Sequence, residues 1–174
     1  MRWIALLRGI NVGKAKRIAM ADLRCWLEEL GFTGVRTVRN SGNAVFDGDP
    51  SRVDAAALED AIAARAGFRA RVVVVGQAEW VEAVRDNPLE VLDPSRFLVG
   101  WVTDPAAVER LGPLLDRPWS PDALAVRGRA VYQRCAAGLL ECPMAAAVAG
   151  ALGDEVTARN WSTTLELHKL LDRG

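Results

Sequence analysis

The sequence predicts an α+β protein made of two tandem units, each with the order strand–helix–strand–strand–helix–strand, followed by a C-terminal helix. Three observations predict this class. Short apolar runs of strand length alternate with segments whose apolar residues recur at helical spacing. The same order of patterns occurs twice along the 174 residues. Hydrophobic residues make up 51% of the chain and charged residues 25%, which is typical of a packed globular fold.

Residues 1–90 are expected to form the first subdomain. Its strands are predicted from β-branched or apolar runs at 3–10, 35–38, 44–46 and 71–75. Its helices are predicted from apolar spacing and from the glycines that follow them, at 20–30 and 50–67. This order of elements is the ferredoxin-like order. A further helix over 78–87 ends before Pro88.

Residues 91–174 are expected to repeat the order. The predicted strands are 97–103, 124–126, 130–135 and 155–158. The predicted helices are 105–115, 143–152 and the closing helix 163–171. The halves share no visible sequence identity, so the duplication rests on element order. We expect the two ferredoxin-like subdomains to form one compact unit.

The composition argues against several classes of protein. No apolar run approaches the roughly 20 residues that span a bilayer, and the N-terminal apolar stretch is too short for a signal peptide. The three cysteines, Cys25, Cys135 and Cys142, form no C-x-x-C motif, so no structural metal site is expected. They are predicted to be reduced thiols of a cytoplasmic protein, with Cys25 in the core.

The charge distribution favours a small anionic ligand over a long nucleic acid. The chain has 22 Lys and Arg against 22 Asp and Glu, whereas proteins that coat nucleic acids usually carry a basic surplus. Residues 1–46 hold eight basic and three acidic residues, so the surplus is local. A general preference for arginine in this chain is the simpler alternative.

The first candidate segment is the loop between the first strand and the first helix. Its glycines let backbone N–H groups approach a ligand, and the following helix begins with a partial positive charge. The candidate ligand-binding residues are Arg8, Gly9, Asn11, Gly13 and Lys14. The loop matches neither a P-loop nor G-x-G-x-x-G. A tight turn with solvated lysines is the alternative.

The second candidate segment is the turn between the second and third strands. This turn, Asn40-Ser41-Gly42-Asn43, offers a hydroxyl and two amides that can bind a polar ligand, and Ser41, Gly42 and Asn43 are the candidate ligand-binding residues. A plain hairpin turn explains the same residues. Ser41 has no evident His or Asp partner, so nucleophilic catalysis is not expected.

The third candidate segment, residues 157–164, joins the last strand to the closing helix. An arginine and the start of a helix can bind an anion, and a tryptophan can stack on a ring. The candidate residues are Arg159, Asn160, Trp161 and Thr164. Ser162 or Thr163 is predicted to cap the helix. The alternative is that Arg159 pairs with an acidic residue and Trp161 packs in the core.

Together the three segments resemble the signatures of the DUF1697 family. The strings are IALLRGINVG at 4–13, RTVRNSGNAVF at 36–46 and TARNWSTT at 157–164. The resemblance implies a small cytosolic bacterial-type protein with a doubled ferredoxin-like fold, and it implies no function. It favours one composite site formed by the three segments. Lys14 stands where many members have a second glycine. Cys142-Pro143-Met144 stands where the family often has Ser-Lys-Leu, so the lysine of that string is absent here.

The function predicted from these segments is binding of a small anionic metabolite or nucleotide, with group transfer as an extension. No general base is evident, so the sequence leaves catalysis and any cofactor undetermined. A nucleic-acid-binding module is the first alternative, although Phe46 alone could stack on a base. A non-catalytic interaction protein is the second, since Trp80, Trp101 and Trp119 could form a dimer face or a core. The protein is expected to be a monomer or a homodimer.

Overall fold

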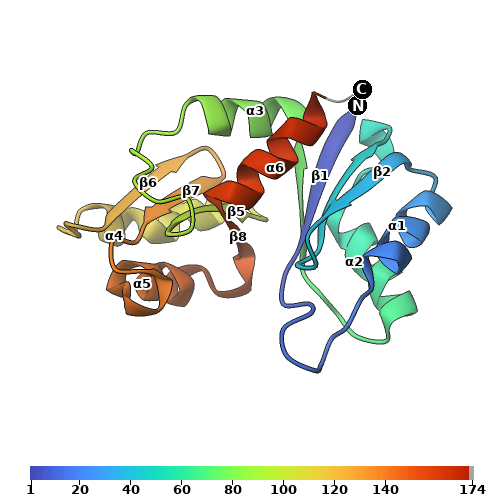
Figure 1. The fold of residues 1–174 in the computed structure, drawn as a ribbon, viewed down its shortest axis with the longest axis horizontal. Coiled ribbons are helices and arrows are strands. Elements are labelled where there is room, and N and C mark those ends of the chain that lie inside the picture. The colour runs from blue at the N-terminus through green and yellow to red at the C-terminus, as the bar shows by residue number, and fades with distance from the viewer. Residues whose placement is uncertain (173–174) are drawn as a thin grey trace. The chain divides into compact units, whose positions relative to one another are not determined.

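A computed structural model describes residues 1–172 of the chain (Figure 1). Among these residues the protein has two four-stranded antiparallel sheets and six α-helices, joined by short 3-10 helices. This confirms the predicted α+β class. Every helix within residues 1–172 is too short or too polar to cross a bilayer.

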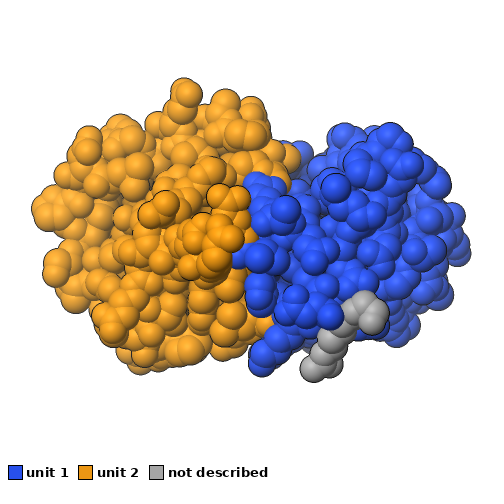
Figure 2. Space-filling view, turned by 90° about the horizontal axis from the view of Figure 1, so that it is seen from above, with its two compact units in different colours: residues 1–81, 166–174 blue, residues 82–165 orange. Residues whose placement is uncertain are grey.

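The chain divides into two compact units, which Figure 2 shows in different colours. The first unit contains residues 1–81 together with the C-terminal residues from Glu166, and the second contains residues 82–165. Two helices cross this division: α3 (Gln77–Arg85) and α6 (Trp161–Leu171). The separation into subdomains 1–90 and 91–174 stays a prediction.

The sheet of the first unit has the strand order β2-β3-β1-β4, and all its neighbouring strands are antiparallel. Its strands are β1 (Arg2–Leu7), β2 (Thr33–Val38), β3 (Asn43–Asp47) and β4 (Val72–Gly76). Leu6 of β1 pairs with Asn43 of β3, and the Leu7 backbone N–H donates to the Gly42 carbonyl at 2.8 Å. The end of β1 therefore lies beside the turn between β2 and β3.

Two helices form the core of the first unit with the sheet. They are α1 (Met20–Glu29) and α2 (Ala55–Ala66), which follows the short 3-10 helix η1 (Pro50–Arg52). The Asp54 carboxylate accepts from the Ala57 N–H at 2.7 Å and so caps α2. Leucine and isoleucine side chains of both helices pack with apolar residues of the strands; the buried ones are Leu23, Leu27, Leu58 and Ile62.

The sheet of the second unit has the corresponding order β6-β7-β5-β8, again antiparallel. Its strands are β5 (Phe97–Val102), β6 (Ala123–Arg127), β7 (Ala130–Arg134) and β8 (Val156–Asn160). Its helical segments are η2 (Pro105–Leu111), α4 (Gly112–Leu115), η3 (Leu139–Glu141), α5 (Pro143–Leu152) and η4 (Gly153–Glu155). The helix predicted over 105–115 is thus a 3-10 helix for most of its length.

Several aromatic residues and one cysteine lie in positions that bear on the predictions. Trp80 and Trp101 are fully buried, as is Phe46, whose ring lies 4.7 Å from that of Phe32. The prediction that Cys25 is in the core is wrong, because its side chain is exposed. Cys25 follows the buried Leu23 by two residues, about 200° around the helix, and so faces away from the core.

Candidate functional site: the hollow at the start of α1

The loop after β1 is fastened to the β2–β3 turn by one side chain. The Asn11 side-chain amide donates to the carbonyl oxygens of Ile18, at 2.8 Å, and Asn40, at 2.7 Å. The amide oxygen of Asn11 accepts from the Ile18 N–H at 2.9 Å. Asn11 also has a φ of +54°, which asparagine tolerates better than most residues. The first two candidate segments therefore meet, and Asn11 shapes the loop.

The β2–β3 turn is held by its own polar residues. Asn43 is fully buried, and its side-chain amide donates to the Val38 carbonyl at 2.8 Å and to the Ser41 hydroxyl at 2.9 Å. Gly42 has a φ of +79°, and a Cβ there would lie 2.7 Å from the Leu7 Cβ. These contacts hold the hairpin turn against β1; that Ser41, Gly42 and Asn43 bind a ligand stays a prediction.

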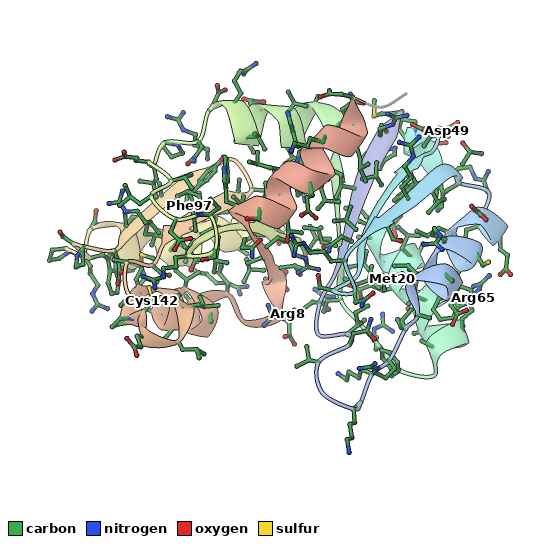
Figure 3. All side chains as sticks on the ribbon, in the orientation of Figure 1. Arg8, Met20, Asp49, Arg65, Phe97 and Cys142 are labelled. Carbon is green, nitrogen blue, oxygen red and sulfur yellow. The ribbon has the colours of Figure 1, made fainter. Side chains whose placement is uncertain are left out.

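A hollow of about 430 Å³ lies where this loop enters α1. Its lining residues come from the loop, from the start of the helix and from the β2–β3 turn: Asn11, Arg17, Ile18, Ala19, Met20 and Asn40. Figure 3 labels Arg8 and Met20, which stand at the two ends of the loop. The lining residues thus include two asparagines and an arginine together with the apolar residues Ile18, Ala19 and Met20.

The start of α1 supplies donors to this region. Ala19 is the N-cap residue and provides no side-chain hydrogen bond to the helix. The first N–H groups of an α-helix have no partner within the helix, so they attract anions. Arg17 is exposed, and one of its NH groups donates to the Gly13 carbonyl at 3.0 Å. The acidic residue of the first turn, Asp22, is exposed and does not line the hollow.

Other predicted residues of the first segment lie in the same loop, outside the lining of the hollow. Gly9 and Gly13 are exposed with φ values of +70° and +66°, so both occupy the left-handed region where glycine is unstrained. Lys14 is exposed, and the Arg8 backbone N–H donates to the Arg71 carbonyl at 2.8 Å.

Sequence reasoning missed four residues of the lining, Arg17, Ile18, Ala19 and Met20, whereas Asn40 lies in the second candidate segment. The available signal was Arg17, a basic residue just before a helix that lacks a capping side chain at Ala19.

The third candidate segment, in the second unit, forms the junction between β8 and α6. The Asn160 side-chain oxygen accepts from the Thr163 N–H at 2.9 Å, and the Thr164 hydroxyl donates to the Asn160 carbonyl at 3.0 Å. Asn160 is therefore the helix cap, and the prediction of Ser162 or Thr163 is wrong. The reason is that β8 runs to Asn160 and the helix begins at once, at Trp161.

Trp161 and Arg159 are both held within this junction. The Trp161 ring meets the Phe97 ring edge-on at 5.4 Å, and its backbone N–H donates to the Pro94 carbonyl at 3.1 Å. Burial lowers the pKa of Arg159 to about 10. One Arg159 NH group donates to the Ala158 carbonyl at 2.9 Å. That this segment joins the first two in one composite site stays a prediction.

The described residues lack the arrangements of side chains that hold metal ions. Within residues 1–172 no group of three or more His, Cys, Asp or Glu side chains is arranged to hold a metal ion.

Comparisons with known proteins agree with the resemblance seen in the three strings. A structure described as that of a conserved bacterial protein from Streptococcus pneumoniae is similar to this chain over 98% of both chains, with a TM-score of 0.73 and 22% sequence identity. At this identity the similarity shows the fold alone. The comparison with curated proteins finds no match. Residues 1–132 match the family described as "Protein of unknown function (DUF1697)". Since this match covers most of the 174 residues, the chain belongs to the DUF1697 family.

Proposed function

We propose that the protein binds a small anionic metabolite in the hollow at the start of α1. The observation that carries this proposal is the position of Arg17 in the lining of the hollow, next to a helix start without a side-chain cap. A guanidinium and a helix N-terminus both favour a negatively charged group, and together they favour it more strongly.

The size and lining of the hollow support a ligand larger than a bare ion. Ligand pockets commonly have volumes of about 300–1,000 Å³, apolar walls and a few polar groups that fix orientation. The hollow, at about 430 Å³, has Ile18 and Met20 as apolar wall and Asn11 and Asn40 as polar groups. A metabolite with one phosphate or carboxylate and a ring or short apolar part, such as a nucleoside monophosphate, fits this description.

Basic residues elsewhere on the same loop support attraction of an anion before it binds. Arg8, Lys14 and Lys16 lie within nine residues of sequence, and the two lysines are exposed. Such a local field raises the rate at which an anion arrives more than it raises affinity. The proposal is binding without turnover, because none of the lining residues is a carboxylate or a histidine that could serve as general base.

A nucleic-acid-binding role is supported less well. Base stacking on a sheet requires exposed aromatic rings on its central strands. Phe46 is the aromatic residue foreseen for that role, and it is fully buried against Phe32.

We also propose that each unit is ferredoxin-like. The antiparallel orders β2-β3-β1-β4 and β6-β7-β5-β8, with helical segments after the first and third strands of each unit, support this arrangement.

The binding proposal is tested by calorimetric titration and amide NMR with inorganic phosphate and adenosine monophosphate, with uncharged adenosine as control. We expect adenosine monophosphate to shift the amide signals of residues 19–22. Arg17→Gln should weaken binding about tenfold, because a hydrogen bond to a charged group contributes about 1.5–3 kcal/mol.

Arg36→Gln is the matched control. Arg36 is also an exposed arginine of the first unit and lies outside the lining of the hollow. Its substitution therefore removes the same charge without changing the hollow. Equal affinity of the two variants would overturn the proposed site, and so would binding of adenosine as tight as that of its monophosphate.

A further inference from the structure

Two cysteines of the second unit enclose a short loop between β7 and α5. Cys135 directly follows β7, and Cys142 is the N-cap residue of α5. Both are buried, with 0% and 4% of their surfaces exposed. They belong to one apolar cluster, which also contains Met144 and Ala145 and has Trp119 and Leu124 packed against it.

The two thiols belong to one buried cluster, and one of them contacts a carboxylate. The Cys142 thiol lies 3.5 Å from the Asp122 Oδ2, to which it donates. The other carboxylate oxygen, Oδ1, accepts from the Ala136 N–H at 2.8 Å, so Asp122 is held between the two cysteine segments.

The backbone of the loop explains why residues seven positions apart meet. The Gly138 N–H donates to the Cys135 carbonyl at 3.1 Å, and the Cys142 N–H donates to the Leu139 carbonyl at 3.4 Å. Gly138 has a φ of +103°, a conformation that suits glycine. The result is a compact turn whose two ends lie together.

The tip of the same loop is apolar and exposed. Leu139 is 50% exposed and Leu140 is fully exposed. A covalent link between the two ends of the loop would therefore act on the segment that presents these leucines to solvent.

We propose that Cys135 and Cys142 are a redox pair that a hydroperoxide converts to an intramolecular disulfide. The geometry points to Cys142 as the thiol that reacts first, because it is the one in contact with a base. Burial raises the pKa of the Cys135 thiol, so Cys135 stays protonated while Cys142 reacts.

The reaction has two steps. In the first, Asp122 accepts the Cys142 proton, and the sulfur attacks one peroxide oxygen. The S–O bond forms, the O–O bond breaks, and the departing oxygen takes the proton and leaves as water or an alcohol. In the second, the Cys135 sulfur attacks the sulfenic acid of Cys142; the S–S bond forms and water leaves with the Cys135 proton. Two thiols are oxidised, and one peroxide is reduced by two electrons.

The test uses the full chain treated with hydrogen peroxide in the folded state. The protein is then denatured in excess N-ethylmaleimide, because the buried Cys135 and Cys142 can react with it only once the chain unfolds, and is digested with trypsin. Cleavage after Arg134 and Arg159 gives one peptide that holds both cysteines. We expect this peptide to lose two hydrogens, to carry no maleimide and to regain both thiols after reduction with dithiothreitol. Cys25, which is exposed in the first unit, is the internal reference for an unpaired thiol.

Two outcomes would overturn the proposal. One is a peptide that carries maleimide on both cysteines after Cys25 has been oxidised. The other is a peptide in which Cys142 gains two or three oxygens while Cys135 remains a thiol, because then the second step does not occur.

The role of Asp122 as a positioned base is tested separately. Asp122→Asn should slow disulfide formation about tenfold near neutral pH and make the rate rise more steeply with pH, since hydroxide then replaces the base. Asp116→Asn is the matched control: Asp116 is an exposed aspartate of the same unit, following α4. A loss of packing alone would leave the pH profile unchanged, and that result would exclude the role as base.

Discussion

The Asn11 side-chain amide donates a hydrogen bond to the Asn40 carbonyl oxygen across 2.7 Å, which joins residues 29 positions apart. Through this bond the loop after β1 and the β2–β3 turn become one structure, and the hollow beside α1 lies against both. Of the candidate residues, Asn11 lines the hollow, and Ser41 and Asn43 hold the turn beside it. The donors that remain available to a ligand are those of Arg17 and the start of α1.

The support given by Asn11 predicts a measurable loss of stability. Asn11→Gly removes the three side-chain hydrogen bonds, and glycine is unstrained at the observed φ of +54°. We therefore expect the free energy of unfolding to fall by about 2 kcal/mol. Asn11→Ala should cost about 1 kcal/mol more, because alanine is strained at positive φ. Urea unfolding measures both, and equal stability of the two variants would contradict the backbone contribution.

Close packing of the turn predicts that two glycines respond differently to the same change. Gly42→Ala places a Cβ 2.7 Å from the Leu7 Cβ at a φ of +79°, so it should cost about 2–4 kcal/mol. Gly13→Ala, at a φ of +66° with no atom within 4 Å, should cost only about 1 kcal/mol. Thermal or urea unfolding tests the difference, and a Gly13 variant as unstable as the Gly42 variant would refute the packing argument.

The Asn160 cap predicts a distinction between two substitutions in the second unit. Asn160→Ala removes the acceptor of the Thr163 N–H, and we expect a loss of about 1 kcal/mol. Asn160→Asp keeps an acceptor at the same place and should keep most of the stability. Hydrogen exchange at the Thr163 amide is the direct readout: it should accelerate in the alanine variant and stay slow in the aspartate variant.

The burial of Tyr132 predicts that the folded protein loses stability at high pH. Tyr132 is the one tyrosine of the chain; it is fully buried, and its hydroxyl donates to the Ala83 carbonyl at 2.9 Å. Burial raises its pKa from 10.0 to about 12. The unfolded chain releases the phenolic proton at lower pH than the folded chain, so the stabilisation is complete below pH 10 and decreases as the pH rises from about 10 to 12.

Ultraviolet absorbance of tyrosinate measures this titration without interference from another tyrosine. The folded protein should ionise near pH 12 and the urea-unfolded chain near pH 10. Tyr132→Phe should remove the tyrosine contribution to the pH dependence. A folded-state transition at the ordinary pKa would mean that the phenol is hydrated.

The proposed redox pair predicts that the oxidised protein is more stable than the reduced protein, which can be measured independently of the oxidation rate. A disulfide between Cys135 and Cys142 would close a loop of eight residues and restrict the unfolded chain, which corresponds to about 2 kcal/mol of stabilisation. Urea unfolding of the oxidised and reduced protein gives this difference. Cys142→Ser, which has no disulfide to form, should show the same midpoint with and without peroxide.

Most of the secondary structure could be predicted from the sequence, because the residues at the ends of the elements agree with the hydrophobic pattern within them. The helix predicted over 143–152 is observed with those bounds, since Pro143 suits a first turn and Gly153 follows the last residue. The helix of the first unit likewise ends at Gly67, whose φ is +78°. The turn between β6 and β7 was recognisable from Gly128.

The site was harder to predict from the sequence, because the same residue types serve two purposes. An asparagine or a threonine near a helix start binds a ligand or caps the helix with the same atoms, and only coordinates distinguish the two uses. Asn43, Asn160 and Thr164 direct their side chains to the backbone. Arg17 was missed because the candidate segment ended at Lys16, one residue before it, and Met20 was missed because an apolar residue gives no sign of a polar site.

Two helices cross the division between the units, and this affects the order in which the units can complete folding during synthesis. Residues 82–165 are an insertion in the first unit, which resumes at Glu166. The returning segment contributes contacts of its own: Glu166 pairs with Arg39, and the Leu171 carbonyl accepts from Arg2 at 2.8 Å. On the ribosome, the unit that begins first therefore receives its last contacts only after the inserted unit has been made in full. A fragment that stops at residue 81 would lack them, whereas residues 82–165 form one uninterrupted stretch of chain.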